Sequence, residues 1–164
     1  MRSGTRSLLF GVHQFLLHPL FVLLAWFWLF GLPPAGMALA IIIHDWGYWG
    51  CESMEGHDGS RHPWFAARLL YRLHLPCEGW QALCHSRFLA AELDAEMSDL
   101  GRADKIGTAL YPVWLWVLLA RFSGEAREYM ADKKFEINSE SRAESASEFF
   151  GRYKKFAMEK WGPK

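Results

Sequence analysis

The chain of 164 residues lacks any paired cysteine motif, which excludes several kinds of small domain. Its three cysteines, Cys51, Cys77 and Cys84, are odd in number and form no Cys-x-x-Cys pair. Free thiols of this kind are typical of a reducing compartment rather than of a disulfide-stabilised domain. The spacing also argues against a Cys/His zinc finger, whose ligand cysteines come in closely spaced pairs.

The sequence also lacks an excess of charge and the common nucleotide-binding fingerprints. Lys plus Arg and Asp plus Glu both number 18. There is no basic strip with interleaved aromatic residues, so we expect no duplex nucleic acid as a partner. A Gly-rich phosphate loop of the Walker type and a dinucleotide-binding fingerprint are also missing. These absences leave the substrate unidentified.

Formal charge is absent from residues 18–43, a span of 26 residues (43 − 18 + 1) that raises the question of a membrane segment. The Gly-Leu-Pro-Pro sequence at 31–34 divides this span into two apolar pieces of about a dozen residues, whereas a transmembrane helix needs about 20. Such lengths favour buried helices. We therefore predict a cytoplasmic protein. A membrane-peripheral protein is the alternative, because short apolar runs are ambiguous in sequence alone.

Strand-like alternation and internal repeats are absent, which predicts an all-α fold in a single domain over residues 1–164. The chain is 51% hydrophobic and 16% aromatic, so it can form a substantial core. We expect the stretch 49–61 to be a loop. The apolar spacing and the Gly and Pro breaks predict helices at 7–17, 20–30, 35–45, 62–73, 78–93, from 97 onward with a kink at Pro112, and at 125–134 and 139–160.

The most informative stretch joins three isoleucines, 41–43, to the adjacent pair His44 and Asp45. An apolar helix that ends in this pair would carry both side chains into a dry interior. An unpaired carboxylate there is costly, so we expect a metal or another cation beside Asp45. Both side chains can ligate one centre if the backbone turns them toward it.

Further ligand candidates follow in the same helix-by-helix order. His18 precedes the His-Asp pair by 26 residues (44 − 18), which is the length of a helix, a turn and another helix. His62 starts the next predicted helix, His85 lies within the one after it, and Asp104 lies within the following helical run. Each successive helix thus offers an imidazole or a carboxylate.

This order of ligands resembles that of the HD-domain superfamily of metal-dependent helical proteins. The sequence His-Asp-Trp-Gly at 44–47 is similar to its His-Asp-x-Gly motif. The sequence His-Pro-Trp-Phe-Ala-Ala at 62–67 is similar to the His-Pro-x-x-Gly-Ala helix of its two-metal members, with Ala66 where glycine is common. Ala-Asp-Lys at 103–105 resembles the segment that carries the last aspartate. The resemblance covers residues 10–120 or so and implies an HD-domain-like helical bundle, which the amphipathic helices at 125–160 extend.

The resemblance implies a dinuclear centre with two divalent transition-metal ions. Imidazole and carboxylate ligands suit Fe, Mn, Zn, Ni or Co and do not rank them. His57, in the preceding loop, competes with His62 as a ligand, and we favour His62 because of its helical context. The implied ligands are His18, His44, Asp45 and Asp104 for the first metal and Asp45, His62 and His85 for the second, so that Asp45 bridges the two.

Charged residues near the predicted ligands are candidates for contact with substrate. Arg87 and Lys105 each lie within two residues of a predicted ligand and could hold a phosphate. Arg61 could do the same from the loop. Glu55 is the best candidate in the acidic loop for a base or a ligand-orienting group. Each of these four is also explained as a solvated charge or an ion-pair partner, whereas Asp45 enters the predicted catalytic set through its bridging position.

The function that we predict is hydrolysis of a small anionic substrate, a nucleotide or another phosphoester, because a two-metal site stabilises charge on phosphoryl oxygens. The alternative also follows from the resemblance. A minority of the superfamily with this ligand order are mixed-valent diiron oxygenases that cleave C–C or C–P bonds. The Arg-Phe-Leu run at 87–89 resembles the basic-aromatic-Leu run after the matching histidine in those enzymes.

A second alternative is a non-catalytic helical protein that associates with a membrane or a partner. The complete ligand set argues against it, because a degenerating site should have lost members. The long apolar runs favour it. They also make a homodimer through the helices at 20–30 or 114–122 plausible, because one small domain cannot readily bury them all.

Overall fold

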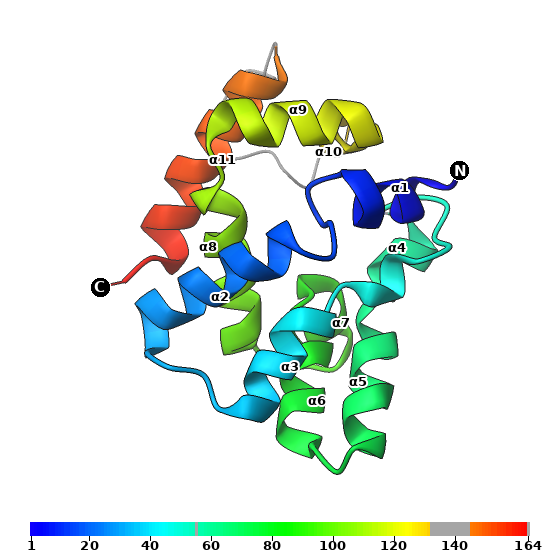
Figure 1. Ribbon diagram of the computed structural model, residues 1–164, viewed down its shortest axis with the longest axis vertical. Helices are drawn as coiled ribbons and strands as arrows, with labels where there is room; N and C mark the ends of the chain where they lie inside the picture. The colour runs from blue at the N-terminus through cyan, green and yellow to red at the C-terminus, as the bar shows by residue number, and fades with distance from the viewer. Residues whose placement is uncertain (55, 132–144, 164) are drawn as a thin grey trace.

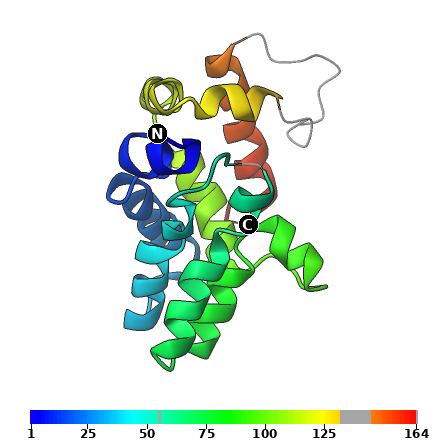
Figure 2. The same ribbon diagram turned by 90° about the vertical axis from the view of Figure 1, so that its right-hand side faces the viewer.

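The computed structural model describes residues 1–54, 56–131 and 145–163, and every regular element in these ranges is helical. The all-α prediction is therefore confirmed. Figure 1 and Figure 2 show the arrangement. The elements are α1 (Ser3–Phe10), α2 (Leu17–Phe30), α3 (Ala35–Ile43), the 3₁₀ turn η1 (Trp46–Tyr48), α4 (His57–Ser60), α5 (Pro63–Arg72), α6 (Pro76–Leu83), α7 (Arg87–Glu92), α8 (Asp99–Leu110), α9 (Val113–Ser123), α10 (Glu125–Ala131) and α11 (Ala146–Trp161).

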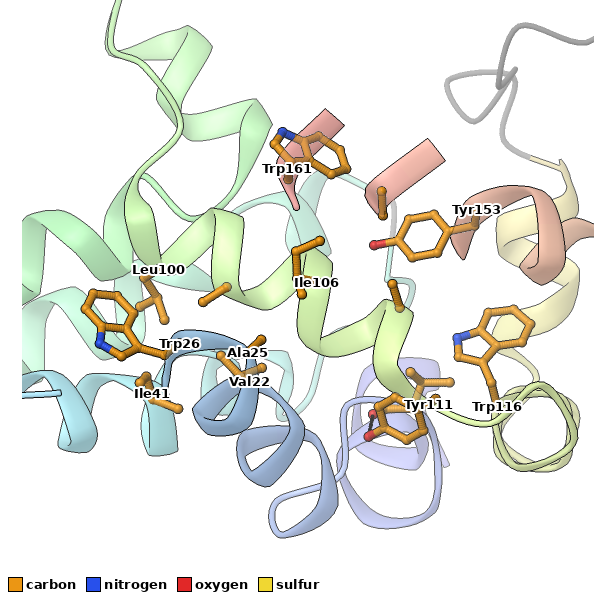
Figure 3. Close-up of a cluster of buried hydrophobic side chains, with 14 of the residues drawn as sticks. Val22, Ala25, Trp26, Ile41, Leu100, Ile106, Tyr111, Trp116, Tyr153 and Trp161 are labelled. Carbon is orange, nitrogen blue, oxygen red and sulfur yellow. Dashed lines mark hydrogen bonds between the residues drawn. The ribbon is translucent and has the colours of Figure 1, made fainter. Parts of the chain in front are cut away.

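The core is built along α8, which packs closely against α2. At Gly107 of α8 a Cβ atom would lie 2.8 Å from the backbone N and Cα of Val22, so the two helices meet with no room for a side chain. Figure 3 shows the apolar side chains that follow α8, from Leu100 at one end to Trp116 at the other. This packing fixes the positions of α2 and α8 relative to one another, and each of these helices carries a predicted metal ligand.

Replacing Gly107 with alanine is expected to lower the free energy of unfolding by about 1–3 kcal/mol, because the methyl group forces α2 and α8 apart. Gly151 of α11 is the matched control, since no described atom lies within 4 Å of a Cβ built there. Gly151→Ala should leave stability unchanged or raise it by up to about 1 kcal/mol. Urea unfolding of both variants measures the difference, and equal effects would contradict the close packing.

The first helix differs from the predicted 7–17. α1 ends at Phe10, and α2 begins only at Leu17. In between, the Val12 N–H donates to the buried Glu125 carboxylate at 2.9 Å, and a Cβ at Gly11 would collide with that same carboxylate. A continuous helix would withdraw this N–H, so the contact with α10 outweighs the local helical preference.

The predicted helix 78–93 is interrupted at 84–86, between α6 and α7. The carbonyl of Cys84 accepts a hydrogen bond from the N–H of Ser98 at 3.1 Å, just before α8 begins. Gly101 of α8 lies so close to His85 that a Cβ there would be 2.9 Å from the His85 carbonyl oxygen. His85 therefore lies in the break between α6 and α7. The prediction that it lies within a helix is wrong.

Other boundaries shift by a few residues. α3 ends at Ile43, so His44 and Asp45 lie in the turn after it, and the predicted loop 49–61 contains the short helix α4. Of the predicted helices 125–134 and 139–160, α10 covers the first as far as Ala131 and α11 covers the second from Ala146. Residues 132–144 lie outside the described part of the chain.

The predicted kink at Pro112 is a sharp bend, and α8 and α9 meet there at 103°. Proline removes a backbone donor and disfavours the helical conformation of the preceding residue, Tyr111, whose ψ is 138°. The bend carries α9 across the end of the bundle, where it packs against α1, α10 and α11 (Figure 1).

Among the described residues, no single helix is long and apolar enough to cross a membrane. α2 is strongly apolar but has 14 residues. α8 and α9 meet the criterion of length and composition only as a pair, across their 103° bend.

Candidate metal centre

The six predicted ligands converge on one buried point. Each has an exposed fraction of 6% or less. Their positions are the first turn of α2 (His18), the turn after α3 (His44 and Asp45), the residue before α5 (His62), the break between α6 and α7 (His85) and the middle of α8 (Asp104).

The six side chains form two overlapping groups that share one carboxylate. Within each group the potential ligand atoms lie within 4.8 Å of one another. Asp45 Oδ2 lies 3.2 and 3.3 Å from the Nε2 atoms of the first group's histidines, and Asp45 Oδ1 lies 3.2 and 3.4 Å from those of the second. The first group consists of His18, His44, Asp45 and Asp104, and the second of Asp45, His62 and His85.

Backbone carbonyls orient three of the four histidines. The Nδ1 atoms of His44, His62 and His85 lie 2.8, 2.6 and 2.5 Å from the carbonyl oxygen of the residue three positions earlier. A carbonyl oxygen only accepts hydrogen bonds, so Nδ1 carries the proton in each ring. Each Nε2 lone pair is then directed into the centre, which is the tautomer that a metal ligand requires.

Several buried polar atoms of the centre are left without a hydrogen bond. Among the described residues, both ring nitrogens of His18, the Nε2 of His44 and the Oδ2 of Asp45 have no such partner. The Nε2 atoms of His62 and His85 lie 3.0 Å apart, and both are acceptors because their protons are on Nδ1. Lone pairs that face one another at this distance need a cation beside them, so the donor set fits metal ions.

Burial and negative charge act in opposite directions on the pKa values of the centre. Burial lowers the pKa of His62 to about 4 and also lowers that of His85, so both imidazoles are neutral at pH 7. Burial disfavours charge on His44 as well, but Asp45 and Asp104 outweigh it and raise its pKa to about 10. Despite burial, His44 holds the pKa of Asp45 and Lys105 holds the pKa of Asp104 well below the usual range, so both carboxyls are ionised. Two ionised carboxylates in a buried centre attract a divalent cation.

A cavity of about 410 Å³ opens on this centre. Asp45, His62, His85 and Asp104 contribute to its lining. The cavity therefore combines the candidate metal centre with a wall from the C-terminal helices. That wall consists of Trp116, Tyr129, Phe149, Tyr153, Phe156 and Trp161.

Two of the predicted substrate-binding cations line the same cavity. Arg87, at the start of α7, and Lys105, on α8, both contribute to its lining. Lys105 Nζ also lies 2.6 Å from Asp104 Oδ2, so it neutralises the carboxylate whose other oxygen lies 3.0 Å from His18 Nε2. Glu55, the predicted base, lies outside the described residues.

The structure does not bring His57 or Arg61 into the centre. The His57 side chain is 77% exposed and lies 3.5 Å from the Asp58 carboxylate. It belongs to neither of the two ligand groups found among the described residues. Arg61 forms an ion pair at 3.6 Å with Glu92, and both side chains are about half exposed. The solvated role that the sequence allowed for Arg61 is the one observed.

His13 and Glu125 form a buried pair beside the centre that the sequence did not reveal. His13 Nδ1 lies 3.0 Å from Glu125 Oε2, and its ring centroid is 5.1 Å from that of His18. The Glu125 carboxylate also accepts hydrogen bonds from Ser123 Oγ at 2.7 Å and from Tyr129 Oη at 3.1 Å. Glu125 follows a Ser-Gly break, where an acidic residue is typical of an exposed helix start, so no local signal marked it as buried.

Tyr48 contacts one of the candidate ligands directly. From sequence, a tyrosine that flanks the His-Asp motif is explained by core packing, with stacking on a substrate as the alternative. In the structure its ring stacks on the imidazole of His62, with centroids 3.7 Å apart and planes inclined by 17°. Tyr48 therefore fixes the plane of a candidate ligand.

These observations establish an all-helical chain with a buried His/Asp cluster that could hold metal ions. We compared the chain with protein-family models, with curated proteins and with solved structures, and none of them matches it.

Proposed function

We propose that this protein is a metal-dependent phosphohydrolase of the HD-domain type that acts on a nucleotide or another small phosphoester. The observation that carries the proposal is the position of Asp45. Its two carboxylate oxygens lie within 3.4 Å of two different pairs of histidines. A carboxylate in this position suits the bridge of a dinuclear centre.

In this proposal the first group and the second group of ligands each hold one divalent transition-metal ion. Such ions supply Lewis acidity toward a phosphoryl group. The imidazoles and carboxylates suit Fe, Mn, Zn, Ni or Co. His62 and His85 are neutral with the proton on Nδ1, so no proton has to leave these rings before they bind metal. His44, whose pKa is raised to about 10 by Asp45 and Asp104, would release a proton from Nε2 when metal binds.

The chain's own side chains would bind and orient the substrate. Lys105 and Arg87 line the cavity and provide positive charge for phosphate oxygens. Lys105 also orients Asp104 through the contact of 2.6 Å. The aromatic wall excludes water and provides flat apolar surfaces for the uncharged part of a substrate, such as a nucleobase. We therefore expect the preferred substrates to join a phosphate to an aromatic or apolar group.

The alternative function, a mixed-valent diiron oxygenase that cleaves a C–C or C–P bond, uses the same six ligands. The two functions differ in one measurable property. The oxygenase requires two irons of unequal valence and consumes oxygen, whereas the phosphohydrolase works with any ion that supplies Lewis acidity. Metal content, the valence of any iron and oxygen consumption together distinguish them.

The deciding experiment is elemental analysis of protein purified without oxygen, with an electron paramagnetic resonance spectrum and a panel of nucleotides and aryl phosphates assayed on the same sample. We expect two metal ions per chain and release of phosphate from members of the panel. Two irons with a mixed-valent signal, together with oxygen consumption and no phosphate release, would favour the oxygenase. Absence of bound metal would refute both enzymatic proposals.

Replacing His62 or His85 with alanine is expected to remove mainly the second metal, because both side chains contact the Oδ1 side of Asp45. About one metal per chain should remain, held by the first group. His57→Ala is the matched control, since His57 lies in the preceding segment and is 77% exposed, and it should keep both metals. If neither His62→Ala nor His85→Ala changes metal content, the centre is mononuclear.

A further inference from the structure

α2 and α9 carry large apolar side chains that no described part of the chain covers. On α2 and the residue before it, the exposed positions recur at helical spacing on the side opposite the buried residues Val22 and Ala25. On α9 the exposed positions recur every four residues, opposite Trp116 and Ala120. These outer faces, with Phe10 of α1, are called the apolar face below. Its members are Phe10, Leu16, Leu20, Leu23, Leu24, Phe27, Trp28, Trp114, Leu118 and Phe122, each at least 37% exposed.

The three helices lie on the same side of the molecule. α2 is in front of α8 in Figure 1, and α1, α2 and α9 all lie toward the left edge of Figure 2, where α9 is seen end-on. α1 packs against α9, and the rings of Phe10 and Phe122 make an edge-to-face contact with centroids 5.9 Å apart. The exposed side chains of α1 and α9 are therefore continuous. Those of α2 lie on the side of the helix opposite the buried residues that pack toward α8.

The charges on these helices have one sign. α1, α2 and α9 contain no Asp or Glu, and their formal charges are Arg6 and Arg121, both exposed. The chain as a whole has equal numbers of acidic and basic residues, so this separation is local. A large apolar surface accompanied by arginines, without carboxylates, fits a partner that is apolar inside and negatively charged at its surface.

We infer that the apolar face binds the surface of an anionic lipid bilayer, with α2 and α9 lying in the plane of the interface. Helices that bind in this way insert their apolar side chains into the boundary between headgroups and acyl chains and keep arginine at the headgroups. Trp28 and Trp114, at 50% and 69% exposure, are the residue type that favours this boundary. No helix has to span the bilayer.

A second copy of the chain is the other partner for such a face, and the charges argue against it. In a two-fold dimer the same surface forms both sides of the interface, so the arginines of both copies would be brought into one contact region. The three helices provide no carboxylate to pair with them, and burying unpaired charge is costly. The headgroups of an anionic bilayer supply the missing negative charge. This inference does not depend on the catalytic proposal, because its residues lie outside the cavity lining.

Co-sedimentation of the full chain with phosphatidylcholine vesicles, with and without phosphatidylglycerol, tests the inference. We expect binding to the anionic vesicles that weakens with salt, together with a blue shift of tryptophan emission. Phe27→Glu and Leu118→Glu should each weaken binding roughly tenfold or more, since each removes an inserted apolar side chain. Arg121→Gln should weaken it about fivefold.

Phe65→Glu is the matched control for Phe27→Glu. Phe65 is an exposed phenylalanine on α5, with 49% exposure against 61%, and α5 is not part of the apolar face. The control should bind vesicles like the unchanged protein. No binding to anionic vesicles, or equal losses in Phe65→Glu and Phe27→Glu, would overturn the inference. So would a lipid-free dimer that Phe27→Glu dissociates, since the face would then be a subunit interface.

Discussion

Replacing Asp45 with alanine is expected to abolish metal binding at both positions and, with it, phosphoester hydrolysis. One carboxylate oxygen lies within 3.3 Å of His18 and His44, and the other lies within 3.4 Å of His62 and His85. Loss of the side chain therefore removes a ligand from both groups at once. Metal per chain, measured by elemental analysis after gel filtration, should fall to background, while the far-ultraviolet circular dichroism spectrum stays helical.

Two further variants make this result specific. Asp45→Asn keeps one carbonyl oxygen and replaces the other by an amide group that cannot ligate, so at most one metal should remain. Asp58→Ala removes an aspartate that is 62% exposed and should keep both metals. Retention of two metals in Asp45→Ala would show that Asp45 is not a bridge.

Replacing Glu125 with alanine is expected to lower the free energy of unfolding by about 3–5 kcal/mol, the largest loss of stability among the changes considered for this protein. The fully buried carboxylate accepts hydrogen bonds from Val12 N–H, Ser123 Oγ and Tyr129 Oη and forms an ion pair with His13. Its removal takes the carboxylate acceptor from the buried Val12 N–H and the charged partner from His13. Urea unfolding in the presence of a chelator measures the loss without a contribution from metal binding.

The controls separate burial from charge. Glu159→Ala, at an exposed position of α11, should change stability by no more than about 0.5 kcal/mol. Glu125→Gln retains an acceptor oxygen and should cost less than the alanine variant. Hydrogen bonds and His13 lower the pKa of Glu125 below its usual 4.5 despite burial, so its stabilising effect is present above pH 4.5 and is lost as the pH falls through the folded-state pKa. Equal stability of Glu125→Ala and Glu159→Ala would refute this role.

The sequence predicts which His and Asp residues come together better than it predicts the helix boundaries. His44 and Asp45 are recognisable because they follow an apolar helical run, and Asp104 is recognisable through the resemblance of Ala-Asp-Lys to the HD-domain pattern. The structure brings the three residues within reach of one another. The ends of α1 and α6 were mispredicted for one physical reason. The Glu125 carboxylate and the Ser98 N–H are distant in the sequence. They form hydrogen bonds with backbone groups that a longer helix would have used for its own hydrogen bonds.

The cavity wall was beyond sequence analysis for a different reason. Each helix that contributes to the wall has apolar residues at the spacing typical of a buried face. Aromatic side chains at such a spacing usually pack in the interior, and this was the interpretation for Trp116, Tyr153 and Phe156. Only the 103° bend after α8 and the return of α11 along α8 turn part of these aromatic rings toward the metal centre. A local pattern contains no information about such a change of direction.

The bend at Pro112 has a consequence for how this protein can change during evolution. All six candidate ligands precede the bend, whereas the aromatic wall of the cavity follows it. Substitutions at Trp116 or Phe149 can therefore reshape the cavity without replacing any candidate ligand. In the proposed enzyme, the part of the chain before Pro112 provides the candidate ligands and the phosphate-binding cations, and the part after it provides the aromatic wall, so contacts with the apolar part of a substrate can diversify separately from the ligands.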